Sequence, residues 1–139
     1  MIFEVSDNGS KSEASIEWQG TDVPTRAAWA NKDDATRDGA YGVGLATIEL
    51  TRGLVAISRA ETKTGADYYL AEPGQAAGDL ENALRLEVSG TDEGGLSVIK
   101  ARLAQKLKQA ANGDSNLPAI ALVVGFAALH VASEDLKNP

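Results

Sequence analysis

Three acidic residues, Glu49, Asp67 and Glu87, lie within otherwise apolar stretches of the chain. An ionised carboxylate in apolar surroundings is costly unless a cation, a hydrogen-bond donor or water compensates its charge. Two or three carboxylates with open positions for water are what Mg²⁺ requires, and a bound Mg²⁺ or Mn²⁺ can activate water against a phosphodiester. The three acids therefore predict a divalent-metal site, provided that the fold brings them together.

The first half of the chain predicts a hairpin followed by a helix. Residues 1–18 contain two strand-like runs on either side of Asn8-Gly9, which is the strongest short signal for a hairpin turn. Asp33 can cap the start of a helix, and apolar residues recur at helical spacing from Arg37 to Arg52. Glu49 belongs to this predicted helix.

The other two acids fall on predicted strands. Residues 54–60 and 66–71 are strand-like runs joined by a polar, glycine-containing turn, so they should form an antiparallel hairpin. Asp67 lies at the start of the second run. Residues 83–89 alternate apolar and polar, which predicts a strand that carries Leu84, Leu86 and Val88 on one face and Arg85, Glu87 and Ser89 on the other.

The clearest helical pattern follows, and a buried strand comes after it. A stripe of apolar residues at spacings of three and four predicts a helix over Leu96–Ala110. Lys100 and Lys106 lie on opposite borders of this stripe, where a long side chain can reach past the helix edge. Their spacing leaves open which lysine faces Glu87. Residues 118–126 are almost continuously apolar, as in a strand covered on both faces.

This order of elements predicts an α/β (α+β) fold with a mixed central sheet flanked by helices. The last strand–helix–strand step should be a right-handed crossover that joins two parallel strands. A length of 139 residues suits a single domain over 1–139, with an N-terminal hairpin at 1–18 and a core at 33–125. The residues expected to be buried together are Leu84, Leu86, Val88, Leu103, Leu107 and Val123.

Composition restricts the chemistry and the partners. With 13 basic and 20 acidic side chains the net charge is −7, which opposes the phosphate attraction that drives non-specific nucleic-acid binding. The absence of cysteine excludes disulfides, thiolate catalysis and zinc sites of the cysteine type. No signal-type segment occurs in residues 1–20 and no apolar run is long enough for a membrane span, so we expect a cytoplasmic protein without a membrane segment.

Two other possible sites receive little support from the sequence. The lone His130 near an apolar run is the usual signature of a core or edge histidine, and no Ser–His–Asp set can be assembled from sequence order. Gly42-Val43-Gly44 lies inside the predicted helix and lacks the remainder of a dinucleotide-binding motif.

The order of the three acids along the chain resembles the core of the PD-(D/E)XK nuclease superfamily, the restriction-endonuclease-like fold. The matching parts are the helix with Glu49, the strand that begins Gly65-Ala66-Asp67-Tyr68-Tyr69, the strand with Glu87-Val88-Ser89, and the helix and strand that follow. The resemblance covers residues 38–125. The string Leu86-Glu87-Val88-Ser89-Gly90 is also similar to one in small uncharacterised bacterial proteins, which implies no function.

The resemblance implies roles for particular residues. In this superfamily the aspartate and the strand glutamate hold a divalent metal, often with a helix glutamate. Asp67 and Glu87 are thus expected to bind Mg²⁺ or Mn²⁺, with Glu49 as a supporting ligand. A lysine two residues after the strand glutamate normally helps to activate water, but Ser89 stands there, so that the motif is E-x-S in place of E-x-K.

Members of the superfamily can carry this lysine on the following helix instead. Lys100 and Lys106 are therefore the candidates that could replace the cation missing at Ser89, and Lys63 could also approach from the turn before Asp67.

Two functions follow from these observations. The first is a divalent-metal-dependent phosphodiesterase acting on nucleic acid, favoured by the placement of the acids. The second is a non-catalytic, degenerate member of the same fold that acts as a structural or interaction protein, expected to be a homodimer. The missing lysine and the acidic net charge favour the second. The two differ in whether Glu49, Asp67, Glu87 and one ammonium group converge in a cleft.

Overall fold

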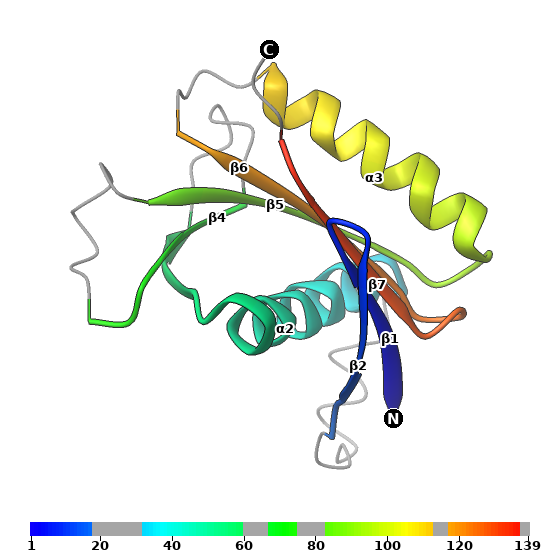
Figure 1. Cartoon of the computed structure of the whole chain (residues 1–139). Helices are drawn as coiled ribbons and strands as arrows, with labels where there is room; N and C mark the ends of the chain where they lie inside the picture. The colour runs from blue at the N-terminus through cyan, green and yellow to red at the C-terminus, as the bar shows by residue number, and fades with distance from the viewer. Residues whose placement is uncertain (18–31, 60–66, 75–82, 113–116, 137–139) are drawn as a thin grey trace.

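A computed structural model describes residues 1–17, 32–59, 67–74, 83–112 and 117–136 of the chain. The fold is α+β, with one mixed seven-stranded sheet in the strand order β2-β1-β7-β6-β5-β4-β3. The elements are β1 (Ile2–Asp7), β2 (Ser10–Ser15), α2 (Lys32–Arg52), β3 (Val55–Arg59), β4 (Tyr68–Ala71), β5 (Leu84–Thr91), α3 (Leu96–Ala111), β6 (Ala119–Gly125) and β7 (His130–Asp135). Helices α2 and α3 cover opposite faces of the sheet (Figure 1). Neither of these helices is long and apolar enough to cross a membrane.

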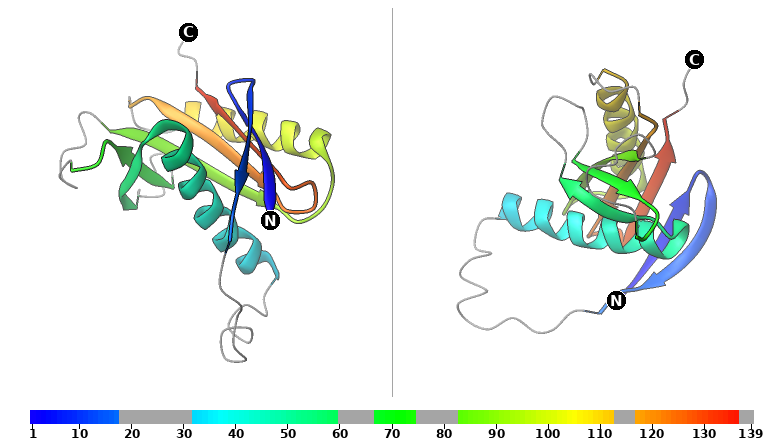
Figure 2. Two further views of the ribbon diagram at one scale, coloured as in Figure 1. Left: turned by 60° about the horizontal axis from the view of Figure 1, so that its bottom comes forward. Right: turned by 90° about the vertical axis from the view of Figure 1, so that its left-hand side faces the viewer.

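The N-terminal hairpin forms as the sequence predicts, but it is part of the central sheet. Asn8 and Gly9 have φ angles of 50° and 84°, the left-handed conformations that a two-residue hairpin turn needs. β1 pairs in parallel with β7, a strand that the sequence analysis did not predict. Figure 2 shows the hairpin lying along the sheet beside β7. Residues 1–17 and the core therefore share one sheet.

The remaining strands follow the predicted order. β3 and β4 are antiparallel, β4 and β5 are antiparallel, and β5 is parallel to β6 across the α3 connection. β4 has four residues and β5 has eight. The β4–β5 pairing ends where Tyr68 lies opposite Leu86. From Val88 to Thr91 no strand of the described chain pairs with β5 on this side, and we call this gap the β5 notch.

The predicted single core is wrong, because the sheet separates its members into two clusters. Leu86 and Val88 pack with Leu122 on the face covered by α2. Val123 packs with Ile99 on the face covered by α3, and the half-buried Leu103 contacts that cluster. Side chains alternate along each strand, so neighbours such as residues 122 and 123 point to opposite faces. Leu107 is half-buried.

The α3 cluster gives a direct test of this packing. Ile99 is 1% exposed and lies so close to Gly125 that a Cβ atom there would sit 2.5 Å from Ile99 Cδ1. Replacing Ile99 by valine should lower the free energy of unfolding by about 0.5–1.5 kcal/mol, because it removes one buried methylene. Val98→Ala, at a side chain 38% exposed, is the control and should change it by less than about 0.5 kcal/mol. If urea denaturation shows that both variants lose the same free energy of unfolding, α3 does not pack on the sheet through Ile99.

Candidate functional site

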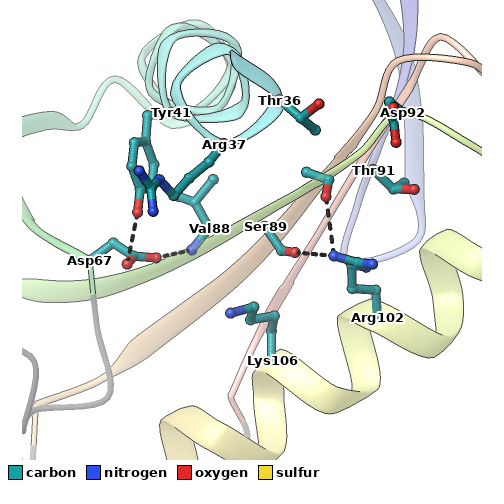
Figure 3. Close-up of a pocket in the computed structure, with 11 residues that line it drawn as sticks. Thr36, Arg37, Tyr41, Asp67, Val88, Ser89, Thr91, Asp92, Arg102 and Lys106 are labelled. Carbon is teal, nitrogen blue, oxygen red and sulfur yellow. Dashed lines mark hydrogen bonds between the residues drawn. The ribbon is translucent and has the colours of Figure 1, made fainter. Parts of the chain in front are cut away.

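A pocket of about 410 Å³ occupies the β5 notch. Because β4 begins opposite Leu86 and no described strand pairs with the rest of β5 on this side, α2 on one face of the sheet and α3 on the other both reach this pocket (Figure 3). Its lining is mostly polar and consists of Thr36, Arg37, Tyr41, Asp67, Val88, Ser89, Gly90, Thr91, Asp92, Arg102 and Lys106.

Asp67 marks one end of the pocket. Its backbone N–H donates to the Leu86 carbonyl at 2.7 Å, and its Oδ2 accepts a hydrogen bond from the Val88 N–H at 2.7 Å. The carboxylate thus continues the pairing of β5 at the point where β4 begins. Its Oδ1 accepts a hydrogen bond of 3.3 Å from the hydroxyl of Tyr41 on α2. The ring of Tyr41 packs edge-to-face against Tyr68, with centroids 5.4 Å apart. Asp67 is therefore held in one orientation from two elements.

Glu87 is buried between β5 and α3, with 8% exposure. The pKa of its carboxyl is raised above the ordinary value, because burial disfavours the charged form and the nearby Asp67 carboxylate repels it. Lys106 opposes both effects in part, since its Nζ lies 3.2 Å from Glu87 Oε1. The site therefore brings two carboxylates and one ammonium group together.

The structure distinguishes the two candidate lysines. Lys106 reaches Glu87 and also donates to the Gln109 side-chain oxygen at 3.1 Å. Lys100 lines a separate pocket over β1 and β7 with Glu4 and His130. His130 is buried there with 9% exposure, and its Nε2 lies 3.0 Å from the hydroxyl of Ser6. Lys106 is thus the helix lysine beside the predicted acids, while Lys100 lies outside the site.

Ser89 contacts a cation that the sequence analysis did not single out. Nη1 of Arg102 donates to Ser89 Oγ at 3.3 Å and to the Gly90 carbonyl at 3.2 Å (Figure 3). Arg102 and Lys106 are four residues apart on α3, so they lie on the same side of that helix. That spacing was visible in the sequence, and it would have identified Arg102 once Lys106 was known to face β5.

Glu49 does not join the other two acids, contrary to the prediction. Its side chain is exposed on α2, whose buried stripe consists of Ala40, Val43, Thr47 and Ile48. Glu49 directly follows Ile48, and a step of about 100° per residue turns it away from the sheet. The part of the chain that the structure describes contains no group of three His, Cys, Asp or Glu residues suited to a metal ion. Lys63, the third candidate cation, lies outside the described residues.

The donor set at this site suits a hard divalent cation. Mg²⁺ and Mn²⁺ prefer oxygen ligands, and Mg²⁺ usually binds through one or two carboxylates while it keeps several waters. Asp67 and Glu87 supply two carboxylates close enough for one to raise the pKa of the other. A cation between them would relieve that repulsion, although both Asp67 oxygens accept hydrogen bonds from the chain and Glu87 is paired with Lys106.

Comparisons with protein-family models, with curated proteins and with solved structures find no match to the chain. Its function must therefore be inferred from the geometry and electrostatics of the β5 notch.

Proposed function

We propose that this chain is a divalent-metal-dependent phosphodiesterase that acts on nucleic acid and has a restriction-endonuclease-like fold. The observation that carries the proposal is the approach of Lys106 to Glu87 at 3.2 Å, beside Asp67, which directly precedes the neighbouring strand β4. A lysine from α3 thus supplies the positive charge that Ser89 cannot. The succession α2, β3, β4, β5, α3 and β6 supports the proposal, because it is the order on which the sequence resemblance rests.

Each residue of the site has a distinct role in the proposed reaction. Asp67 and Glu87 would hold Mg²⁺ or Mn²⁺, and the metal would supply Lewis-acid polarisation of the phosphate and a more acidic bound water. Lys106 keeps a positive charge at the Glu87 carboxylate, where it can offset negative charge that develops on the phosphate. Tyr41 and the Val88 N–H fix the direction of the Asp67 carboxylate. The burial of Glu87 strengthens these electrostatic interactions, because the local dielectric constant is low.

The proposal is tested by nucleic-acid cleavage. Purified protein should cleave at least one of single- and double-stranded DNA and RNA with Mg²⁺ or Mn²⁺, and EDTA should stop the reaction. Asp67→Asn keeps the side-chain shape but removes a metal-binding charge, and it should lower the cleavage rate by about 10² or more, since it weakens the electrostatic stabilisation of the transition state. Circular dichroism checks that the variant folds. A parent protein that leaves all four substrates intact with both metals would overturn the proposal.

A second candidate function is a non-catalytic structural or interaction protein, acting as a homodimer. It is favoured by a specific observation: both Asp67 oxygens accept hydrogen bonds from the chain itself, and Glu87 is paired with Lys106. The two acids are therefore satisfied without a metal. Strands β2 and β3 form the two edges of the sheet, where a second copy could pair. Sedimentation equilibrium that finds a dimer, together with no metal-dependent cleavage, would favour this function.

A further inference from the structure

Arg102, a cation that lines the pocket at the end away from Asp67, has no function in the proposal above. Arg102 is exposed, and its Nη1 donates only to neutral oxygens, those of Ser89 and Gly90. Across the described part of the chain, no carboxylate lies within ion-pair distance of its guanidinium. Arg102 thus carries a positive charge that is held in place by β5 but not neutralised.

A guanidinium held in this way is suited to a phosphate. It has five N–H donors in a planar arrangement that matches two oxygens of one phosphate, and two contacts by Nη1 leave Nε and Nη2 available. Fixing the side chain against the strand also lowers the entropy lost when a ligand binds. The serine of the E-x-S motif therefore has a role of its own, because Ser89 anchors Arg102 in the pocket.

Gly90, which follows Ser89, explains how α2 forms the wall of the pocket opposite α3. A Cβ atom at position 90 would lie 2.7 Å from the Ala40 Cβ and 3.0 Å from the Thr36 carbonyl oxygen. Glycine therefore allows the N-terminal half of α2 to approach β5 closely. This approach brings Thr36 and Arg37 to the pocket that Arg102 enters from α3 (Figure 3).

The pocket consequently has two chemically different ends. Asp67 and Lys106 line one end beside the buried Glu87. Arg102 supplies positive charge at the other end, near Thr91 and Asp92, whereas the Arg37 side chain extends from α2 toward Tyr41 and the Asp67 end (Figure 3). A negative ligand group is thus favoured beside Arg102 and disfavoured at Asp92.

We propose that Arg102, anchored by Ser89, binds a backbone phosphate of single-stranded nucleic acid. The inference rests on the proposed function, in which it places the phosphate next to the one that is cleaved. A single strand is favoured over a duplex because the net charge of −7 opposes contact with a long double-stranded polyanion. The lining cations, Arg37, Arg102 and Lys106, are confined to a pocket of about 410 Å³ between two helices, which suits one narrow chain.

Binding in EDTA tests this site independently of cleavage. The anisotropy of a labelled single-stranded oligonucleotide is measured with the parent protein, with Arg102→Gln and with Lys108→Gln. Lys108 is an exposed residue of the same helix that does not line the pocket. Its variant loses one positive charge, as Arg102→Gln does, and therefore serves as the control. Arg102→Gln should raise Kd about tenfold, the loss of one charge-assisted contact, and Lys108→Gln should change it less than about twofold.

The salt dependence provides a second readout. Removing one phosphate contact to a single strand should reduce the slope of log K against log salt by about 0.7 in Arg102→Gln, while the slope in Lys108→Gln stays at the parent value. Ser89→Ala keeps every charge and should still weaken binding, because Arg102 loses its anchor. It also serves as the test if Arg102→Gln does not fold.

The outcomes separate this site from the proposed function. Absence of oligonucleotide binding by the parent protein, equal losses in Arg102→Gln and Lys108→Gln, or tighter binding of a duplex of the same sequence would each overturn the phosphate site. Arg102-dependent binding without metal-dependent cleavage would support the site and reject the phosphodiesterase. If Arg102→Gln changes neither cleavage nor binding, the result would support the phosphodiesterase and reject the phosphate site.

Discussion

Replacing Lys106 by methionine should lower metal-dependent cleavage by about 10²–10³, the usual effect of removing one preorganised electrostatic group. Lys106 Nζ is 3.2 Å from Glu87, so its charge lies where negative charge on a phosphate would develop. Methionine keeps an unbranched apolar side chain of similar length, and the packing of the half-buried residue against β5 should persist. Single-turnover rates with saturating Mn²⁺ measure the effect on the chemical step without a contribution from product release.

Lys100→Met is the matched control for this experiment. Lys100 lies on the same helix and its variant loses the same charge, but it lines the pocket with Glu4 and His130. We expect its cleavage rate to stay within about twofold of the parent rate, since distant surface charges contribute little. If the two variants lose activity equally, the role assigned to Lys106 is wrong and the effect comes from the overall charge of α3.

The elements that the sequence predicted well are those set by local chemistry. Asn8-Gly9 determines the hairpin turn, and the apolar stripe from Leu96 determines α3. β7 was missed for a physical reason. Its buried residues include His130 and Ser133, whose polar atoms meet Ser6 and Asp7 on β1, more than 120 residues earlier in the chain. A hydrophobic pattern does not reveal a strand whose burial depends on hydrogen bonds to so distant a partner.

The candidate site was predictable only in part. The approach of Asp67, directly before β4, to the neighbouring strand β5 followed from the order of the elements, whereas the rotation of α2 that exposes Glu49 depends on how the helix packs. The choice between Lys100 and Lys106 depends on the tilt of α3 over the sheet, which helical spacing does not determine. The pocket itself arises because β4 is shorter than β5, so that Arg102 and Tyr41 can enter from opposite faces.

Glu87→Gln should make the metal-free protein more stable at neutral pH. The pKa of Glu87 is raised from its ordinary value of 4.5, so the folded state binds a proton at this group more readily than the unfolded state does. Between the ordinary and the raised pKa the folded state therefore holds more protons, and the free energy of unfolding falls as pH rises through this window. Below the window the group is neutral in both states and the cost disappears. Glutamine is neutral at every pH, so the variant avoids the cost.

Thermal denaturation in EDTA between about pH 4 and pH 8 measures this difference. The melting temperatures of parent and variant should diverge as pH rises, with the variant the higher, while its side-chain oxygen can still accept a hydrogen bond from Lys106. Addition of Mn²⁺ should reverse the order, because the parent gains stability by binding the metal and the variant has lost one ligand charge. At ten times Kd this gain is about 1.4 kcal/mol, or about 3–5 °C for a chain of this size.

A loss of stability in Glu87→Gln would favour a different function. If Glu87→Gln is less stable than the parent at neutral pH in EDTA, and Mn²⁺ shifts neither protein, the Glu87–Lys106 pair stabilises the fold by itself. A buried ion pair that stabilises the fold needs no metal, and this outcome would favour the structural homodimer over the phosphodiesterase. A buried acid that destabilises the metal-free fold, in contrast, is a cost that metal binding offsets, as expected of a functional site.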